Sequence, residues 1–311
     1  MHGDGTTPAT ERRTPGGLHR TAEIPRPRYR DPASGLQGRV LDGRYAIEKR
    51  VGEGGMAYVY RATDLRTKQV VAIKVLMSKL VNDAESVARL RREAELATKL
   101  DHPNVCGLLA HGEANGLPYL VMPYLEGETL SVRENRIGKM PPREAIPILI
   151  QVCEGLQHAH DRGVLHRDLK PENVMLVKAD GGERAVVMDF GLAKERIVGT
   201  ELDRLTATGI VLGTPEFMSP EQIRGKPLDP RSDVYALGVL AFELLTTELP
   251  FTGSTAQETM LNHLAGRPRK LRSVDPALPA SLERIIDKAI ALDPAARFES
   301  LRAMGEALRS A

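Results

Sequence analysis

Cysteine and tryptophan are nearly missing from this sequence of 311 residues, which contains two cysteines and no tryptophan. Cys106 and Cys153 each lie in an apolar context, and neither has a second cysteine at C-x-x-C spacing. This pattern argues against a disulfide framework and against a zinc site built from cysteines. We expect both thiols to be buried small side chains in a reducing compartment.

Long hydrophobic runs and a strong excess of charge are also missing. The longest apolar run, residues 234–245, is interrupted by Glu243 and is too short to span a bilayer. The start of the chain is rich in arginine, proline and glycine without an apolar segment, so we expect no secretory signal there. The 43 basic and 41 acidic residues give a formal net charge of +2, too balanced to indicate a nucleic-acid partner. We therefore expect a cytoplasmic protein with no membrane segment in this chain and no nucleic-acid partner.

The sequence does contain enough apolar material for a sizeable core, since 41% of its residues are hydrophobic and 27% are charged. Residues 1–38 differ, because they are rich in proline, glycine, threonine and arginine. We expect them to form a disordered leader that buries too little surface to offset chain entropy, with a partner-binding arm as the alternative. Residues 39–308 are expected to form the folded domain.

A glycine-rich segment, residues 52–60, follows a strand predicted from the alternating pattern of residues 45–51. Glycines allow backbone N–H groups to approach phosphates without a Cβ in the way. Ala57 occupies the third glycine position of G-x-G-x-x-G, and the residues after it are typical of a second strand rather than a helix. The segment therefore favours a phosphate-binding hairpin over a dinucleotide-binding turn.

Lys74 lies inside a strongly apolar strand, residues 69–76, where its charge needs an anionic partner or an edge position. In the helix predicted for residues 84–100, apolar residues recur every three or four positions and form one buried stripe. Glu93 lies on the same side as that stripe and is a candidate for this anionic partner, which the family resemblance described below assigns to it. A surface ion pair is the alternative.

A polar octet, His166-Arg167-Asp168-Leu169-Lys170-Pro171-Glu172-Asn173, lies between a predicted helix, residues 143–160, and an apolar strand, residues 174–177. A loop between a helix and a strand is a rigid mount for polar side chains. Its aspartate can accept a proton, its lysine can neutralise anionic oxygens, and its asparagine oxygen suits a hard cation such as Mg²⁺. Taken alone, the octet could also be a charged surface loop.

After a turn and a second strand, residues 185–188, the chain continues with Asp189-Phe190-Gly191, so that Asp168 and Asp189 can line one cleft. With these blocks, residues 44–308 resemble the eukaryotic-like (Hanks-type) serine/threonine protein kinases of bacteria, whose catalytic loop the octet matches at every signature position. The resemblance implies an α+β, bilobal protein kinase fold. Residues 44–125 would form an N-lobe of antiparallel β-sheet plus one helix, with the hinge, and residues 126–308 a mostly α-helical C-lobe.

The resemblance also implies transfer of the ATP γ-phosphate to serine or threonine hydroxyls of protein substrates, with Mg²⁺ or Mn²⁺ as cofactor. It assigns Asp168 to orient and deprotonate the hydroxyl, Lys170 to steady the transferring group, and Lys74 with Glu93 to hold the α- and β-phosphates. It assigns the metal to Asn173 and Asp189. The implied ATP-binding residues, including hinge backbone groups for adenine, are Val51, Gly52, Glu53, Gly54, Gly55, Met56, Ala57, Tyr58, Val59, Ala72, Lys74, Met122, Pro123, Leu125 and Met175.

Residues 192–219 resemble an activation segment. Thr206 and Thr208 lie where bacterial members of the family commonly autophosphorylate, and Thr214 is expected to bond near Asp168 and Lys170. We hypothesise that phospho-Thr208 orders this segment and sets Glu93 against Lys74. Self-association would allow this phosphorylation to occur in trans.

Two further residues are implied to have structural roles: Asp233 would anchor the catalytic loop, and Arg297 would pair with Glu221. Two other functions compete with the kinase interpretation. A pseudokinase-type nucleotide-binding scaffold is disfavoured because Lys74, Asp168 and Asp189 are all present. A small-molecule phosphotransferase is disfavoured by the full activation segment, which would shape a groove for a protein chain.

Overall fold

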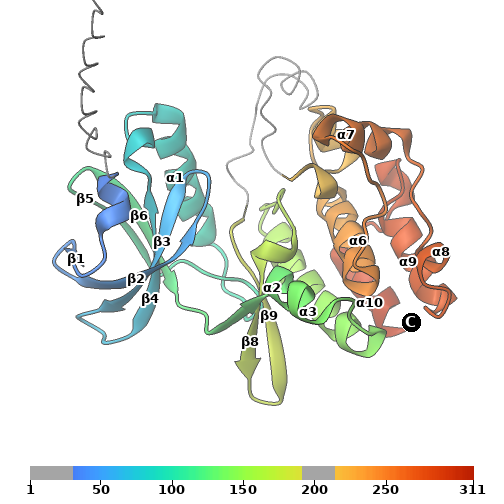
Figure 1. Cartoon of the computed structure of the whole chain (residues 1–311), viewed down its shortest axis with the longest axis horizontal. Helices are drawn as coiled ribbons and strands as arrows, with labels where there is room; N and C mark the ends of the chain where they lie inside the picture. Colours follow the sequence, from blue (N-terminus) through green and yellow to red (C-terminus); the bar gives the residue numbers. More distant parts are fainter. Residues whose placement is uncertain (1–30, 191–213) are drawn as a thin grey trace, which may run out of the picture. The chain divides into compact units, whose positions relative to one another are not determined.

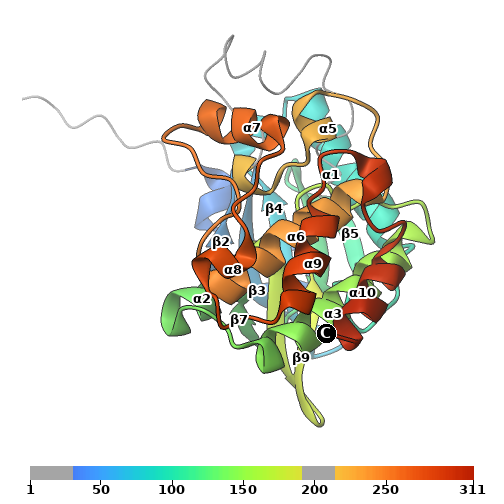
Figure 2. The ribbon, with the colours of Figure 1, turned by 90° about the vertical axis from the view of Figure 1, so that its right-hand side faces the viewer.

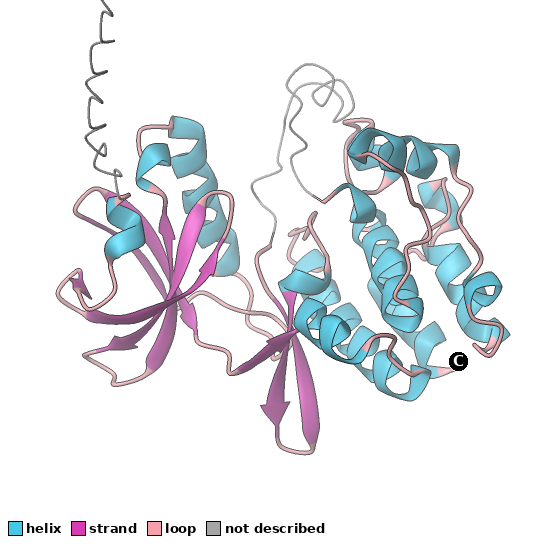
Figure 3. Ribbon diagram, in the orientation of Figure 1, coloured by secondary structure: helices cyan, strands magenta, loops and turns pink. Residues whose placement is uncertain are grey.

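The computed structural model describes residues 31–190 and 214–311, apart from the side chains of Glu85, Arg89 and Glu93. Figure 1 shows this folded unit as an N-lobe rich in strands and a C-lobe rich in helices. Colouring by secondary structure separates the two lobes clearly (Figure 3). The expected α+β, bilobal architecture is therefore confirmed. The leader residues 1–30 lie outside the described residues, so the prediction of a disordered leader is not addressed for them.

The N-lobe is organised around one antiparallel sheet in the order β1-β2-β3-β4-β6-β5. Alternate residues of β3 and β4 are buried, which is the pattern expected of strands with one face on a core. Helix α1, Ala84–Ala97, packs through Leu90 and Ala94 against Leu76 and Leu120 of the sheet. The strands are β1 (Val40–Leu41), β2 (Tyr45–Glu53), β3 (Ala57–Asp64), β4 (Val70–Leu76), β5 (Ala110–Ala114) and β6 (Leu117–Pro123).

The folded unit begins at Asp31, eight residues earlier than the boundary predicted from composition. Pro32–Gly35 form a short 3₁₀ helix, η1, and the side chains of Ala33 and Leu36 are buried in the N-lobe core. The prediction that the leader extends to residue 38 is therefore wrong for its last eight residues. Ala33 and Leu36 are too few to change the average composition of residues 1–38. Their burial in the N-lobe core is nevertheless enough to fix this short segment on the folded domain.

The C-lobe is built around helix α6, Arg231–Thr246, which is buried on nearly every side. A helix that is apolar all round belongs in a core, and α6 packs against α3 and α9 (Figure 2). The other helical segments are α2 (Leu130–Ile137), α3 (Pro142–His160), η3 (Pro171–Asn173), η5 (Pro215–Phe217), α5 (Pro220–Ile223), α7 (Ala256–Ala265), α8 (Leu271–Val274), α9 (Ala280–Ala289), η6 (Pro294–Ala296) and α10 (Leu301–Arg309). Across the described ranges, none of the helices has the length and apolar character needed to span a bilayer.

A small second sheet, in the order β7-β8-β9, carries the catalytic loop at one end. Its strands are β7 (Gly127–Thr129), β8 (Val174–Ala179) and β9 (Gly182–Val187). The predicted strand–turn–strand unit after the octet is thus confirmed, and the turn contains Gly181 and Gly182 at positive φ. Because β8 and β9 pair from end to end, the residues just before β8 and just after β9 lie side by side.

The loop between α1 and β5 ties the N-lobe to the C-lobe. The Asn104 carbonyl accepts the Val187 N–H at 2.9 Å, and the Cys106 N–H donates to the Val187 carbonyl at 2.8 Å. A Cβ at Gly155 of α3 would lie 2.5 Å from the Asn104 carbonyl oxygen, so only glycine allows this approach. Cys153 is buried as expected, whereas Cys106 is only partly buried because it lies in this connecting loop.

Candidate active site

The catalytic loop is held by one buried carboxylate, Asp233, near the start of α6. Asp233 Oδ2 accepts the His166 N–H at 2.8 Å and Oδ1 accepts the Arg167 N–H at 2.9 Å, while His160 Nε2 lies 2.7 Å from Oδ2. Arg167 has a φ of +64°, a left-handed conformation that these bonds hold in place. The expected anchoring role of Asp233 therefore has a geometric basis.

The charge of Asp233 survives burial because of these partners. Burial alone would raise the pKa of the carboxyl group, but the hydrogen bond and charge of His160 and the N–H of His166 outweigh it and hold the pKa below its ordinary value. The group is 1% exposed and remains ionised. Charge-assisted bonds of this kind are stronger than neutral ones.

His166 braces the catalytic loop against the segment that carries Asp189. Its Nε2 lies 2.9 Å from the Met188 carbonyl oxygen, and its Nδ1 accepts the Asp168 N–H at 3.3 Å. Only the neutral ring with its proton on Nε2 satisfies both contacts. Complete burial lowers the pKa of His166, which favours that neutral form. The ring also contacts Phe190, with centroids 4.9 Å apart.

Asp168 and Lys170 lie close together and face the end of the activation segment. Lys170 Nζ is 3.6 Å from Asp168 Oδ2 and donates to Thr214 Oγ1 at 3.1 Å. The Asp168 side chain is 23% exposed and that of Lys170 is 21% exposed, so both are reachable from solvent. The predicted grouping of Asp168, Lys170 and Thr214 is therefore present.

Lys74 reaches this site from β4 of the N-lobe. Its Nζ lies 2.9 Å from Asp189 Oδ1, and the charge of Lys74 holds the pKa of Asp189 below its ordinary value. Lys170 lowers the same pKa through its charge, which places it in the neighbourhood of Asp189. The expected partner Glu93 lies on α1, but its side chain is outside the described residues, so the Lys74–Glu93 pair stays a prediction.

Asn173 and Asp189 are adjacent because the Met188 N–H donates to the Asn173 carbonyl oxygen at 2.8 Å. The Asn173 side-chain amide donates to the Asp168 carbonyl at 2.8 Å, which leaves its Oδ1 to serve as a metal ligand. Across residues 31–190 and 214–311, no cluster of three His, Cys, Asp or Glu side chains could hold a metal by itself. One carboxylate and one amide oxygen fit an ion such as Mg²⁺, which completes its shell with water and phosphate oxygens.

The glycine-rich segment forms the turn between β2 and β3, as predicted. The Gly54 N–H donates to the Ala57 carbonyl at 2.9 Å, and Val59 lies opposite Lys74 in the sheet register. A Cβ at Gly55 would meet nothing within 4 Å, and one at Gly54 would meet only the Ala57 carbonyl oxygen at 3.8 Å. The fold itself therefore does not require glycine at these two positions, and the approach of a phosphate to them stays a prediction.

The segment predicted to be the hinge follows β6. Met122 pairs with Ala72 of β4, and β6 ends at Pro123. Leu125 and Met175 are both only partly buried, although Met175 sits between the buried residues Val174 and Leu176. The assignment of adenine contacts to these residues stays a prediction.

Two residues that fix the site were missed in the sequence. Gln222 of α5 completes a capping box with Ser219 and also donates through Nε2 to the Arg167 carbonyl at 2.8 Å. His160 at the end of α3 meets Asp233. The Ser-x-x-Gln spacing of the capping box was visible in the sequence, whereas the His160–Asp233 contact joins residues 73 positions apart and had no local signal.

The predicted pair of Arg297 and Glu221 is present and buried. Arg297 donates to both carboxylate oxygens of Glu221, at 2.7 and 2.9 Å, and Ser232 donates to the same carboxylate at 2.7 Å. This pair ties the end of the activation segment to the loop before α10. Thr206 and Thr208 lie outside the described residues, so their phosphorylation stays a prediction.

Four carboxylates from four segments, one of them in the catalytic loop, are near enough to raise one another's pKa values, a feature that the sequence did not reveal. They are Glu134 of α2, Glu172 of η3, Glu216 of η5 and Glu243 of α6. Burial and the charge of Glu172 raise the pKa of Glu134 to about 7. Burial and the three other carboxylates raise the pKa of Glu243 to about 8. These groups were not recognised because their proximity depends entirely on tertiary packing.

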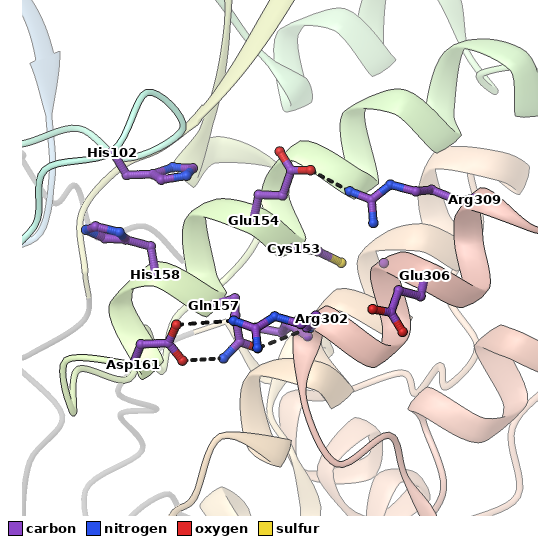
Figure 4. A pocket seen from close by; sticks show the side chains of 11 residues that line it. His102, Cys153, Glu154, Gln157, His158, Asp161, Arg302, Glu306 and Arg309 are labelled. Carbon is purple, nitrogen blue, oxygen red and sulfur yellow. Dashed lines mark hydrogen bonds and ion pairs between the residues drawn. The ribbon is translucent and has the colours of Figure 1, made fainter.

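A cavity of about 450 Å³ lies elsewhere, between α3 and α10 (Figure 4). Two acidic side chains of its lining form ion pairs, Glu154 with Arg309 and Asp161 with Arg302. None of the predicted site residues lines it. The residues expected to act in the reaction converge instead at the catalytic loop.

Comparison with known proteins agrees with this geometry. The family profile described as "Protein kinase domain" matches residues 45–308. Serine/threonine-protein kinase PrkC of Bacillus subtilis is 40% identical over 276 residues, covering 89% of this chain and 42% of PrkC. Serine/threonine-protein kinase pkn3 of Myxococcus xanthus is 39% identical, covering 88% of this chain and 51% of pkn3. The chain thus spans about half, or less, of the length of these relatives.

Solved structures show the same likeness. The PknI kinase domain of Mycobacterium tuberculosis is 28% identical with a TM-score of 0.69, covering 88% of this chain and 97% of that one. A structure of Rad53 residues 1–466 in complex with AMP-PNP is 25% identical with a TM-score of 0.69, covering 84% of this chain and 64% of that one. The profile match and the bacterial relatives together show that this chain belongs to the protein kinase domain family, among the bacterial serine/threonine protein kinases.

Proposed function

We propose that this chain is an ATP-dependent serine/threonine protein kinase. The observation that carries the proposal is the convergence of Lys74 with Asp189, and of Asp168 with Lys170 and Thr214, at one site. These are the side chains that phosphoryl transfer requires on the phosphate side and on the acceptor side. Catalysis of this type consists mostly of positioning and charge stabilisation.

Each residue has a distinct task in the proposed reaction. Lys74 binds the α- and β-phosphates of ATP, and Lys170 stabilises the charge that develops on the transferring group. Asp168 orients the substrate hydroxyl and accepts its proton late in the transfer. Asn173 and Asp189 hold a divalent cation, with Mg²⁺ as the proposed ion and Mn²⁺ as a substitute. When bound, this cation neutralises the phosphate oxygens.

The competing scaffold function is less well supported. A nucleotide-binding scaffold could use Lys74 and Asp189 to hold ATP, but it has no use for Asp168 paired with Lys170. The contact between Lys170 and Thr214 links the phosphate-binding side to the segment expected to face the substrate, which favours a protein substrate over a small molecule.

An Asp168→Asn variant tests the proposal. We expect phosphate transfer from radiolabelled ATP to a threonine-containing protein to fall about 10³-fold, while ATP still binds with its wild-type affinity. The control is Asp180→Asn, which changes an exposed carboxylate in the β8–β9 turn and should leave transfer unchanged. Transfer at the wild-type rate by the Asp168→Asn protein would remove Asp168 from its role.

We also propose that Thr206 and Thr208 are autophosphorylated in trans. The support is their position before Thr214 in the sequence and the basic side chain of Arg167 beside the catalytic aspartate, which can pair with a phosphate. Replacing both threonines with alanine should lower peptide phosphorylation by the purified protein. Undiminished phosphorylation would show that they have no regulatory role.

A further inference from the structure

The carboxylate of Asp31 joins the beginning of the folded unit to a distant turn. It caps its own 3₁₀ helix, η1, by accepting the Ala33 N–H at 2.8 Å. Both of its oxygens also lie 3.2 Å from the Ser78 N–H, 47 residues further along the chain. The Ser78 hydroxyl oxygen in turn accepts the Ala33 N–H at 3.2 Å. The two short helices η1 and η2 (Ser78–Leu80) are therefore capped reciprocally by each other's side chains.

Buried contacts hold this segment on the N-lobe. Ala33 is fully buried and Leu36 is 6% exposed, in the same cluster as Tyr60 and Met77. The Tyr60 hydroxyl donates to the Ala33 carbonyl from the sheet side. The segment thus has two separable attachments, one through Tyr60 to the sheet and one through Asp31 to Ser78. We call residues 31–36 the N-terminal clamp.

Ser78 occupies a junction of the elements expected to bind the phosphates of ATP. The strand that carries Lys74, β4, ends at Leu76, two residues before it. The Met77 N–H donates to the Met56 carbonyl of the glycine-rich turn at 2.9 Å. The Met77 carbonyl accepts the Leu80 N–H at 2.8 Å, and the Leu80 carbonyl accepts the N–H of Asp83, which caps α1.

We propose that Asp31 is a positioning residue for phosphoryl transfer. By fixing Ser78, its carboxylate sets the relative placement of the glycine-rich turn, of Lys74 and of α1, the helix that carries Glu93. The Tyr60 attachment stabilises the same clamp without touching this junction. The inference rests on the proposed kinase function and adds to it a residue outside the matched kinase domain, which begins at residue 45.

The test compares Asp31→Ala with Tyr60→Phe in the full chain. Both variants loosen the clamp and both should lower Tm, but only Asp31→Ala releases Ser78. We expect Asp31→Ala to raise KM for ATP about 10-fold, because charge-assisted bonds at the junction are lost, with KM for the peptide unchanged. Tyr60→Phe should change KM for ATP less than about 2-fold. Asp31→Asn keeps one acceptor oxygen, so its KM for ATP should lie between those of wild type and Asp31→Ala.

Two controls keep the result interpretable. Ser34→Ala removes a hydroxyl whose hydrogen bond, to the Asp31 carbonyl, stays within the clamp, and should have no effect on KM. Ser78→Ala removes one acceptor from the junction without changing the charge and serves as the second variant if Asp31→Ala fails to fold. Equal KM values for ATP in wild type, Asp31→Ala and Ser78→Ala, or equal changes in Asp31→Ala and Tyr60→Phe, would overturn the inference.

The inference and the proposed function fail separately. If the wild-type protein transfers no phosphate from ATP, the proposed function is wrong. Equilibrium binding of Mg²⁺–ATP then still tests the clamp, since Asp31→Ala should weaken binding about 10-fold relative to Tyr60→Phe. Equal binding by the two variants would remove Asp31 from any role in nucleotide placement.

Discussion

Replacing Asp233 tests whether one buried carboxylate holds the catalytic loop in its active geometry. An Asp233→Ala variant leaves the N–H groups of His166 and Arg167 buried without their acceptor and removes the partner of His160. Each orphaned buried donor costs about 1–3 kcal/mol, so we expect a loss of about 4 kcal/mol in the free energy of unfolding. At about 2–4 °C per kcal/mol, Tm should fall by about 10 °C.

The isosteric Asp233→Asn variant separates charge from volume. One oxygen of Asn accepts one backbone N–H, but its amide group then faces the other donor. We expect a loss of about 2 kcal/mol and a fall in kcat of about 10²-fold, because a loop displaced by about 1 Å loses its alignment. Since the pKa of Asp233 is lowered on folding, its contribution is present above the unfolded pKa and is lost only as the pH falls below it. The difference from wild type should therefore persist across the range above about pH 5.

Urea unfolding at three pH values in this range, together with steady-state kinetics, measures both effects. The matched control is Asp229→Asn, because Asp229 is an exposed acid near the same end of α6 whose side chain accepts the Arg231 N–H. It should lower stability by less than about 1 kcal/mol and leave kcat unchanged. If Asp233→Asn matched this control in both stability and kcat, the anchoring role of the carboxylate would be refuted.

Three further predictions follow from buried charges and from the metal ligands. Arg297→Ala leaves the carboxylate of Glu221 buried without its main partner and should cost about 3–5 kcal/mol in urea unfolding; a loss under about 1 kcal/mol would contradict the buried pair. Because folding raises the pKa of Glu243 to about 8, its ionisation destabilises the fold increasingly as the pH rises from about 4.5 to about 8. Glu243→Gln should thus stabilise the protein by about 1–3 kcal/mol at pH 8.5 and hardly at pH 5, and equal effects at both values would exclude the raised pKa. Removing divalent cations with EDTA should abolish phosphate transfer while leaving Tm within about 2 °C, since the described residues form no metal cluster on which the fold depends; a larger fall in Tm would indicate a structural ion.

Much of the candidate active site could be predicted from short, contiguous sequence patterns. The octet that contains Asp168, the strand that carries Lys74 and the turn before Asp189 were all recognised because each is contiguous in sequence, and their roles were assigned through the family resemblance. The long-range pair of Arg297 and Glu221 was inferred only through the family resemblance. Nothing in the chemistry of an isolated arginine or glutamate indicates its partner 76 positions away.

The features that the sequence did not reveal depend on tertiary packing. Asp31 lies in a segment whose composition predicts disorder. Its proposed positioning role depends on the hydrogen bond to Ser78, and no local sequence pattern indicates that contact. The raised pKa values of Glu134 and Glu243 arise because helices bring carboxylates together that are charged and solvated in the unfolded chain. In both cases the burial of a few side chains decides the outcome, and the composition of the surrounding sequence does not indicate that burial.

At Gly54 and Gly55, where an added Cβ would have open space, the residue that gives the most stable fold differs from the residue expected to favour activity. A methyl group fits at both positions and neither glycine has a positive φ. Alanine there should therefore raise Tm slightly, because it lowers the conformational entropy of the unfolded chain. A variant library screened only for thermal stability would therefore enrich alanine at these positions. The selected variants would be more stable but less active. These two positions are best held fixed when the protein is engineered for robustness.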